Sequence, residues 1–256
     1  MTQLMAFTKK EFMEVIRTGK FLILTVLFII FGVMNPAIAK LTPWMMEAFS
    51  ESLKGSGLTV TEAKVDALTS WTQFYKNVPM ALIVFLLMFS GILAVEYQKG
   101  TLINMITKGL TRWKIVVSKS VVLLLLWSFG YWMCYGITYG YNEYFWDNSI
   151  AKDVAFAAFC VYMLGVWLIA LLMLMSTIFS SGSAVAVGTG GVFFVIYLLS
   201  MLPDLKEYLP TCLMGASGLL SGAGEAGDYT TALVVAVGLT VVQLVVAVLA
   251  FNRKNV

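Results

Sequence analysis

Two short glycine-containing motifs lie next to each other near the end of the chain, in the segment GASGLLSGAGEAG at positions 215–227. The first four residues have the form G-x-S-G, in which Ser217 could act as a nucleophile. The last six have the form G-x-G-x-x-G, which binds dinucleotide phosphates where it joins a strand to a helix. The motifs predict different chemistry: hydrolysis by a serine, or binding of a nucleotide cofactor.

The remainder of the sequence supports neither kind of chemistry. A nucleophilic serine needs an adjacent base, and because the chain contains no histidine it cannot form the Ser–His pair of rhomboid-like intramembrane proteases. The nearest lysine in the sequence, Lys206, belongs to a predicted outer loop. The GAGEAG motif neither follows a predicted strand nor opens a helix, and the three cysteines lack the spacing of a metal site. We therefore expect no catalytic, cofactor-binding or metal-binding residues.

The composition indicates a membrane protein. Hydrophobic residues make up 60% of the 256 residues and charged residues only 12%, whereas soluble domains are roughly a quarter charged. Apolar runs of about 18 or more residues predict membrane-spanning helices. Six such runs leave no room for a soluble catalytic domain, so we expect a single all-α membrane domain over residues 1–256. The predicted spans are residues 21–41, 78–95, 115–138, 154–179, 184–202 and 229–251.

The distribution of charge predicts the orientation. On the side of the termini, the predicted segments hold eleven basic and three acidic residues, and on the opposite side six basic and eleven acidic residues. Since basic residues accumulate on the cytoplasmic side of membranes, we expect both termini in the cytoplasm. The acidic outer side suggests that the protein handles cationic molecules; a solvated loop surface is the alternative.

The predicted spans contain almost no ionisable residues. Ion-coupled transporters place such residues near the middle of the membrane, but here Glu96 and Lys119 lie at span ends, and Gln243 is the main strongly polar side chain deep in a span. Any energy for transport would therefore come from a source other than an ion gradient.

The N-terminal half carries three further local signals. Residues 3–18 predict an amphipathic helix lying in the membrane interface before the first span. Pro36, which follows Asn35, is expected to kink or end the regular helix of that span. Aromatic residues around the first outer loop are expected at the level of the lipid head groups: Trp44, Trp71, Phe74 and Tyr75.

Two predicted spans carry small residues at spacings that let helix backbones approach each other closely. Such faces serve internal packing in one subunit, or an interface between subunits. The positions are Gly136 and Gly140 in the third span and Ala184, Gly188 and Gly190 in the fifth.

The predicted cytoplasmic connection between the second and third spans reads EYQKGTLINMITKGLTRWKIVVSK, residues 96–119. Leu102, Ile106 and Leu110 fall on one face of a short predicted helix over 100–111, with Ile103 beside them. An apolar stripe that faces the cytosol favours docking to a partner protein, whereas contact with lipid head groups is the alternative. Basic residues surround the stripe: Lys99, Lys108, Arg112 and Lys114.

This connection resembles the coupling-helix region of ABC-2 type transporter permeases, which typically read E-x-x-x-G-T-L before a basic helical stretch and a lysine that enters the third span. The matching positions are Glu96, Gly100, Thr101, Leu102 and Lys119. The segment before the first span is similar to the elbow helix of the family. The first outer loop is longer than in minimal members, which puts the substrate in doubt.

The resemblance implies a bacterial plasma-membrane half-transporter that pairs with a second copy of itself and binds two copies of a cytoplasmic ATPase. ATP and Mg would be held by that ATPase, since no G-x-x-x-x-G-K-[ST] motif occurs here. The coupling residues would be Glu96, Gly100, Thr101, Leu102, Ile103, Ile106, Lys108 and Arg112.

The expected activity is export of an amphipathic or hydrophobic cargo, with a peptide or antibiotic favoured, and the expected contacts include membrane lipid but no nucleic acid. The alternative is a polytopic membrane scaffold or sensor that transports nothing. The resemblance also implies that Gly215, Ser217 and Gly218 belong to a re-entrant outer segment that closes the exit of the pathway.

Overall fold

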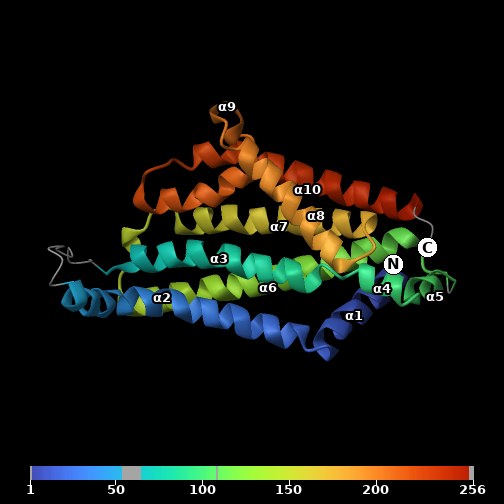
Figure 1. The fold of residues 1–256 in the computed structure, drawn as a ribbon, viewed down its shortest axis with the longest axis horizontal. Helices are drawn as coiled ribbons and strands as arrows, with labels where there is room; N and C mark the ends of the chain where they lie inside the picture. Colours follow the sequence, from blue (N-terminus) through green and yellow to red (C-terminus); the bar gives the residue numbers. More distant parts are fainter. Residues whose placement is uncertain (1, 54–64, 108, 254–256) are drawn as a thin grey trace.

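The computed structural model describes residues 2–53, 65–107 and 109–253, and this part of the chain is helical without a strand. Six of its helices are long and apolar enough to cross a membrane, as the sequence predicts. They run along the long axis of the molecule, with α8 inclined to the others (Figure 1). The six are α2 (Lys20–Leu53), α3 (Ala67–Phe89), α6 (Arg112–Phe145), α7 (Val154–Ile178), α8 (Gly182–Leu199) and α10 (Gly227–Arg253).

Shorter elements lie at the ends of this bundle and along its side, where α9 projects (Figure 1). At one end, α1, α4 and α5 gather near both termini (Figure 1). These elements are α1 (Thr2–Arg17), α4 (Ala94–Gln98) and α5 (Thr101–Thr107). The others are η1 (Asn148–Ile150), α9 (Pro203–Lys206) and the 3₁₀ segment η2 (Pro210–Ser221), which packs along α7 and α10.

The aromatic residues before the second span form part of the core. Helix α3 begins at Ala67, eleven residues before the predicted span, with the Asp66 side chain accepting a hydrogen bond from the Thr69 amide at 2.9 Å as its N-cap. Trp71 and Phe74 on this added part are completely buried and Tyr75 nearly so. These three rings therefore pack inside the protein and not on its surface. Their level in the membrane, like that of Trp44, stays a prediction.

Large rings packed against glycines bring the central helices close together. The Phe28 ring of α2 occupies the space that a side chain on Gly130 of α6 would need. In the same way, the Trp127 ring of α6 occupies the space beside Gly165 of α7. Both rings are fully buried. In such a close-packed core an added methyl group displaces its neighbours, so these two glycines set the spacing between α2, α6 and α7.

Helix α2 contains Pro36 and Pro43 and continues through both to Leu53, so the expectation that Pro36 could end the helix is wrong. A proline has no N–H for the carbonyl four residues earlier, which for Pro36 is that of Gly32. The Gly32 carbonyl instead accepts a hydrogen bond from the Thr138 hydroxyl of α6, at 3.1 Å. Membrane helices tolerate proline where a neighbouring side chain satisfies the freed backbone group.

Thr138 belongs to a buried polar cluster that joins α2, α3 and α6. Its hydroxyl accepts a hydrogen bond from Asn35 Nδ2 at 2.9 Å, and Asn35 Oδ1 accepts one from Asn77 Nδ2 at 2.7 Å. Asn35 and Thr138 are completely buried. The sequence pattern pointed to Gln243 as the main polar side chain within a span and missed this cluster, which is the larger polar feature.

Replacing Thr138 by valine tests whether this cluster sustains the helix through the proline. The variant keeps the shape of the side chain but removes the hydrogen bonds to Gly32 and Asn35, so the free energy of unfolding should fall by about 1 kcal/mol. Chemical or thermal unfolding of the purified protein in maltoside detergent measures the change.

The matched control is Thr240→Val in α10, where the hydroxyl donates only to the Ala236 carbonyl of its own helix. That substitution should leave the stability nearly unchanged. Equal losses in the two variants would contradict the role given to Thr138.

Candidate functional site

A buried ion-pair cluster joins three elements at the end of the bundle that holds the termini. Lys119, near the start of α6, has its Nζ 2.6 Å from Oε2 of Glu11 on α1 and 3.0 Å from Oε1 of Glu96 on α4. The exposed fractions of the three residues are 2%, 5% and 8% in that order. A charge removed from water to this extent needs close partners of opposite charge, and these carboxylates supply them.

Lys10 adds a second ammonium group at the edge of the cluster. Its Nζ lies 3.0 Å from Glu11 Oε1, 2.9 Å from Glu14 Oε2 and 3.8 Å from Glu96 Oε1. Burial opposes the charged form of Lys10, but hydrogen bonds to Glu14 and Glu11 outweigh it and raise the pKa of the lysine. Burial likewise disfavours the charged Glu14, but the hydrogen bond from Lys10 prevails and lowers its pKa.

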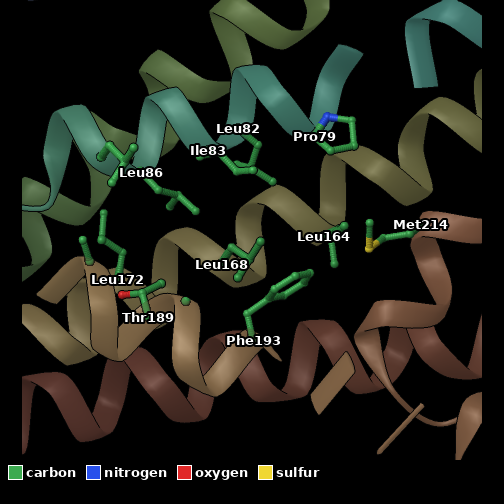
Figure 2. Close-up of a pocket in the computed structure, with 13 residues that line it drawn as sticks. Pro79, Leu82, Ile83, Leu86, Leu164, Leu168, Leu172, Thr189, Phe193 and Met214 are labelled. Atoms are coloured by element: carbon green, nitrogen blue, oxygen red, sulfur yellow. The ribbon is translucent and has the colours of Figure 1, made fainter. Parts of the chain in front are cut away.

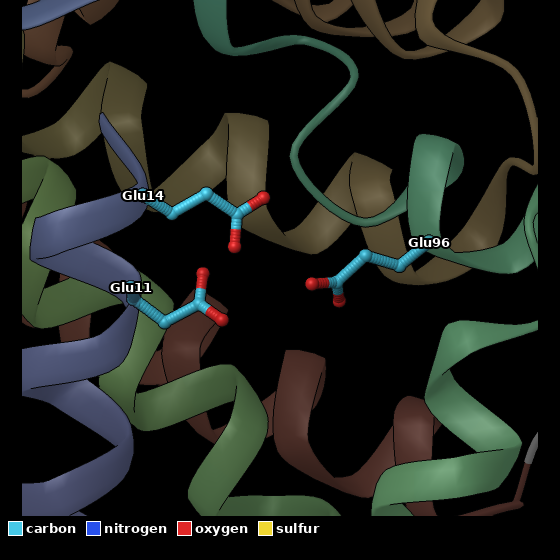
Figure 3. Close-up of side chains that lie close together, drawn as sticks. All are labelled: Glu11, Glu14 and Glu96. Carbon is cyan, nitrogen blue, oxygen red and sulfur yellow. The ribbon is translucent and has the colours of Figure 1, made fainter. Parts of the chain in front are cut away.

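The three carboxylates converge from α1 and α4 (Figure 3), with ligand oxygens within 4.8 Å of one another. This spacing would also suit a cation. Two lysine ammonium groups already lie among them, however, so their proximity is accounted for by ion pairing. We therefore interpret the cluster as a structural joint between α1, α4 and α6.

The joint determines where α5 begins. Glu96 lies at the centre of α4, and the chain then turns at Gly100, whose φ of +63° is in the region that favours glycine. Thr101 is the first residue of α5, and its hydroxyl donates a 3.4 Å hydrogen bond to the Glu96 carbonyl. Glu96, Gly100 and Thr101 of the predicted coupling set thus lie together.

The apolar stripe of α5 faces the protein and not the cytosol, contrary to the expectation. Leu102 is completely buried and Ile106 is half-buried against the same core. The helix ends at Thr107, short of the predicted 111, so Leu110 lies beyond it and is half-buried against that core as well. Ile103 is 49% exposed and presents an apolar side chain on the outside of the helix. Coupling to a partner would therefore use Ile103 and the polar residues around it, while the stripe fixes α5 to its own chain.

The end of α5 and the start of α6 are held by backbone and side-chain hydrogen bonds. Gly109, at φ +85°, donates to the Ile106 carbonyl at 2.9 Å, as expected of a glycine that ends a helix. Arg112 reaches the Asn252 carbonyl at 3.2 Å, which connects this region to α10. Lys108, also in the predicted coupling set, lies outside the described residues.

The predicted small-residue faces serve different purposes. A side chain on Gly188 of α8 would come within 2.7 Å of the Phe179 ring, so this glycine allows close packing inside the subunit. Gly136, Gly140 and Gly190 have no atoms of the described chain near a would-be side chain. Ala184 is half-buried. An interface between subunits through the three open glycines stays a prediction.

The segment η2 is anchored by a tyrosine of α10. The Tyr229 hydroxyl donates a 2.8 Å hydrogen bond to the Gly215 carbonyl, and a side chain on Gly215 or Gly218 would be in van der Waals contact with that hydroxyl. Ser217 is half-buried beside them. Leu213, Ala216, Leu219 and Leu220 of the same segment are buried. Its role as a re-entrant gate stays a prediction.

An apolar pocket of about 360 Å³ lies between α3, α7 and α8 and was not predicted from the sequence. Figure 2 shows Leu164, Leu168 and Leu172 of α7 along its floor, with Phe193 of α8 on one side and Met214 of η2 at one end. The one hydroxyl that lines it, that of Thr189, already donates to the Val185 carbonyl. The pocket therefore offers only apolar contacts.

Replacing Lys119 by methionine tests the buried joint. The variant leaves the Glu11 and Glu96 carboxylates buried without their principal cation, so the free energy of unfolding should fall by about 3–5 kcal/mol. Thermal unfolding measures the loss, and limited proteolysis should show faster cleavage of α1. A triple variant with Glu11→Gln and Glu96→Gln removes the unpaired charges and should recover most of the stability.

The matched control is Lys114→Met on the same helix. Lys114 is half-buried and its ammonium bonds Gln3 Oε1 at 2.8 Å, without a carboxylate partner in the described chain. The Lys114→Met variant should be nearly as stable as the wild type. If Lys119→Met is as stable as this control, the joint does not hold the region together.

Comparison with known proteins places these features in a family. The model of the ABC-2 family transporter proteins matches residues 5–205, a range that includes the ion-pair cluster, α5 and all spans except α10. The chain is also 25% identical over 232 residues to an uncharacterized transmembrane protein, YxlG, of Bacillus subtilis (strain 168), across 90% of this chain and 89% of that protein. The chain therefore belongs to the ABC-2 family of transporter proteins, as a membrane-spanning permease.

Proposed function

We propose that this chain is the permease subunit of an ATP-driven exporter in a bacterial plasma membrane. Two copies form the pathway, and each binds one copy of a separate cytoplasmic ATPase. The observation that carries the proposal is the attachment of α5 to the buried joint of Lys119, Glu11 and Glu96. When the ATPase displaces a helix that is held in this way, α1 and α6 move with it, as a rigid-body mechanism requires.

The energy source is assigned to the partner because this chain lacks the means to bind nucleotide. Its sequence contains no phosphate-binding loop of the form G-x-x-x-x-G-K-[ST]. The basic residues of α1 and of the 96–119 connection support a cytoplasmic position for this end of the bundle. ATP and Mg then belong to the partner, and closure of the ATPase pair moves the two α5 helices.

The cargo is proposed to be amphipathic or hydrophobic, with a peptide or antibiotic favoured. The pocket between α3, α7 and α8 supports an apolar cargo, since it is more than twice the size of the ~150 Å³ apolar cavity that takes up benzene. Met214 of η2 closes the end of that pocket away from the ion-pair cluster. The outer segment with Gly215, Ser217 and Gly218 is proposed as the exit gate.

An aspartate at Ile103 tests the docking role of α5. Because Ile103 is exposed, a charge there should leave the fold intact while it opposes apolar contact with the ATPase. Co-purification with an ABC ATPase subunit that binds the wild-type permease should fall at least tenfold. ATP hydrolysis stimulated by the permease should fall with it.

Ile150→Asp is the matched control, since Ile150 is 51% exposed and lies in η1 at the opposite end of the bundle. This variant should bind the ATPase as the wild type does. Undiminished binding and stimulation by Ile103→Asp, at unchanged thermal stability, would show that α5 is not the docking element.

A further inference from the structure

A second pocket, of about 420 Å³, lies where the outer end of α6 meets η1 and the start of α7. Tyr135, Tyr139 and Glu143 follow one another at intervals of four residues, so they form one face of α6. Asp147 and Asn148 continue this wall beyond the helix. The opposite wall is small and apolar: Ala151, Val154 and Ala155.

The Glu143 carboxylate is held in place from the inside of the protein. Asn148, only 8% exposed, donates hydrogen bonds from Nδ2 to Glu143 Oε2 at 2.9 Å and to the Tyr139 carbonyl at 3.3 Å. The same asparagine accepts a 3.0 Å hydrogen bond from the indole of the buried Trp71. A fully satisfied buried side chain therefore orients an exposed carboxylate, which is the arrangement of a preorganised site.

Asp147 supplies a second negative charge. Hydrogen bonds from the Ser149 hydroxyl, at 2.6 Å, and from the Ser149 amide, at 2.8 Å, lower the pKa of Asp147, so the group is ionised at neutral pH. Among the residues that line the pocket none is basic. The residues that line the pocket therefore carry a net negative charge from two carboxylates.

Two aromatic rings line the pocket, that of the half-buried Tyr135 and that of the exposed Tyr139. The Tyr135 and Tyr139 ring centroids are 6.1 Å apart, and both rings pack on Trp71, at 5.3 Å and 6.3 Å. These ring contacts restrict the two tyrosines, and the faces of aromatic rings attract cations. The lining thus combines tyrosine rings and alkyl groups with two carboxylates.

We propose that this pocket binds an amphipathic organic ammonium ion, with its charged group at Glu143 and Asp147 and its apolar part on Tyr135 and Tyr139. A metal ion would not use the aromatic wall, and a neutral apolar molecule would not use the carboxylates. The ammonium group comes from a free amine at the outer face or from the head group of a membrane phospholipid. Binding at this site needs neither the ATPase nor transport.

The test is equilibrium dialysis of radiolabelled benzyltriethylammonium against the purified full-length protein in maltoside detergent, which carries no ammonium group. Wild-type protein should bind this cation and should not bind benzenesulfonate. Glu143→Gln keeps the acceptor for Asn148 but removes the charge, and it should raise the Kd about tenfold. Tyr139→Leu should raise the Kd several-fold, whereas Tyr139→Phe, which keeps the ring face, should not.

Glu225→Gln is the charge-matched control, because Glu225 is exposed in the connection from η2 to α10 and does not line the pocket. Equal weakening by Glu225→Gln and Glu143→Gln would overturn the proposal, as would equal binding of the cation and of benzenesulfonate. Addition of phosphatidylethanolamine or phosphatidylglycerol distinguishes the sources of the ammonium group. Displacement by phosphatidylethanolamine alone assigns the site to a lipid head group, and displacement by neither assigns it to a free amine.

Discussion

The ion pairs of Lys119 are the interaction on which the arrangement of α1, α4 and α5, at the end of the bundle near the termini, depends. The ammonium group is almost fully buried, and its two nearest carboxylates come from α1 and α4. Removal of one partner from a buried ion pair lowers the free energy of unfolding far more than removal of one partner from an exposed pair. Neither α1 nor α4 can therefore move independently of α6 without leaving a charge unpaired. Because α5 follows α4 directly, its position relative to the spans depends on the same three residues.

A second polar centre complements the first one farther along the spans. The hydrogen bonds of Thr138, Asn35 and Asn77 connect α2, α3 and α6 where Pro36 interrupts the helix ladder. Between helices in lipid, hydrophobic burial contributes little to association, and packing and hydrogen bonds take over its role. The Lys119 joint lies near the start of α6 and this cluster near its other end. The cluster joins α2 and α3 to α6, and the Lys119 joint fixes α1 and α4 to the same helix.

Periodicity and composition predicted the number of spans, the helix before the first span and the existence of a distinct 96–119 connection. The faces of these elements were harder to predict. The stripe of Leu102, Ile106 and Leu110 has the same pattern whether it contacts a partner or its own core. Gly130 and Gly165 carry no spacing motif, because each accommodates one ring from another helix. Glu11 is unusual in the sequence because it is an acidic residue in a basic segment. Its partner, Lys119, is 108 positions away and can be identified only from the structure.

The central claim is that α5 and α1 move as one body when the partner ATPase closes. Double electron–electron resonance between spin labels at Lys9→Cys and Thr107→Cys, in dimers with one labelled subunit, measures the distance between α1 and α5 directly. Dimers that carry Thr107→Cys labels in both subunits measure the distance between the two α5 helices. Both positions are exposed, and Cys212→Ser removes the thiol that is only half-buried. The account predicts the same α1–α5 distance with and without ATP, while the distance between the α5 helices of two subunits changes. An α1–α5 distance that changes by as much as the intersubunit distance would contradict it.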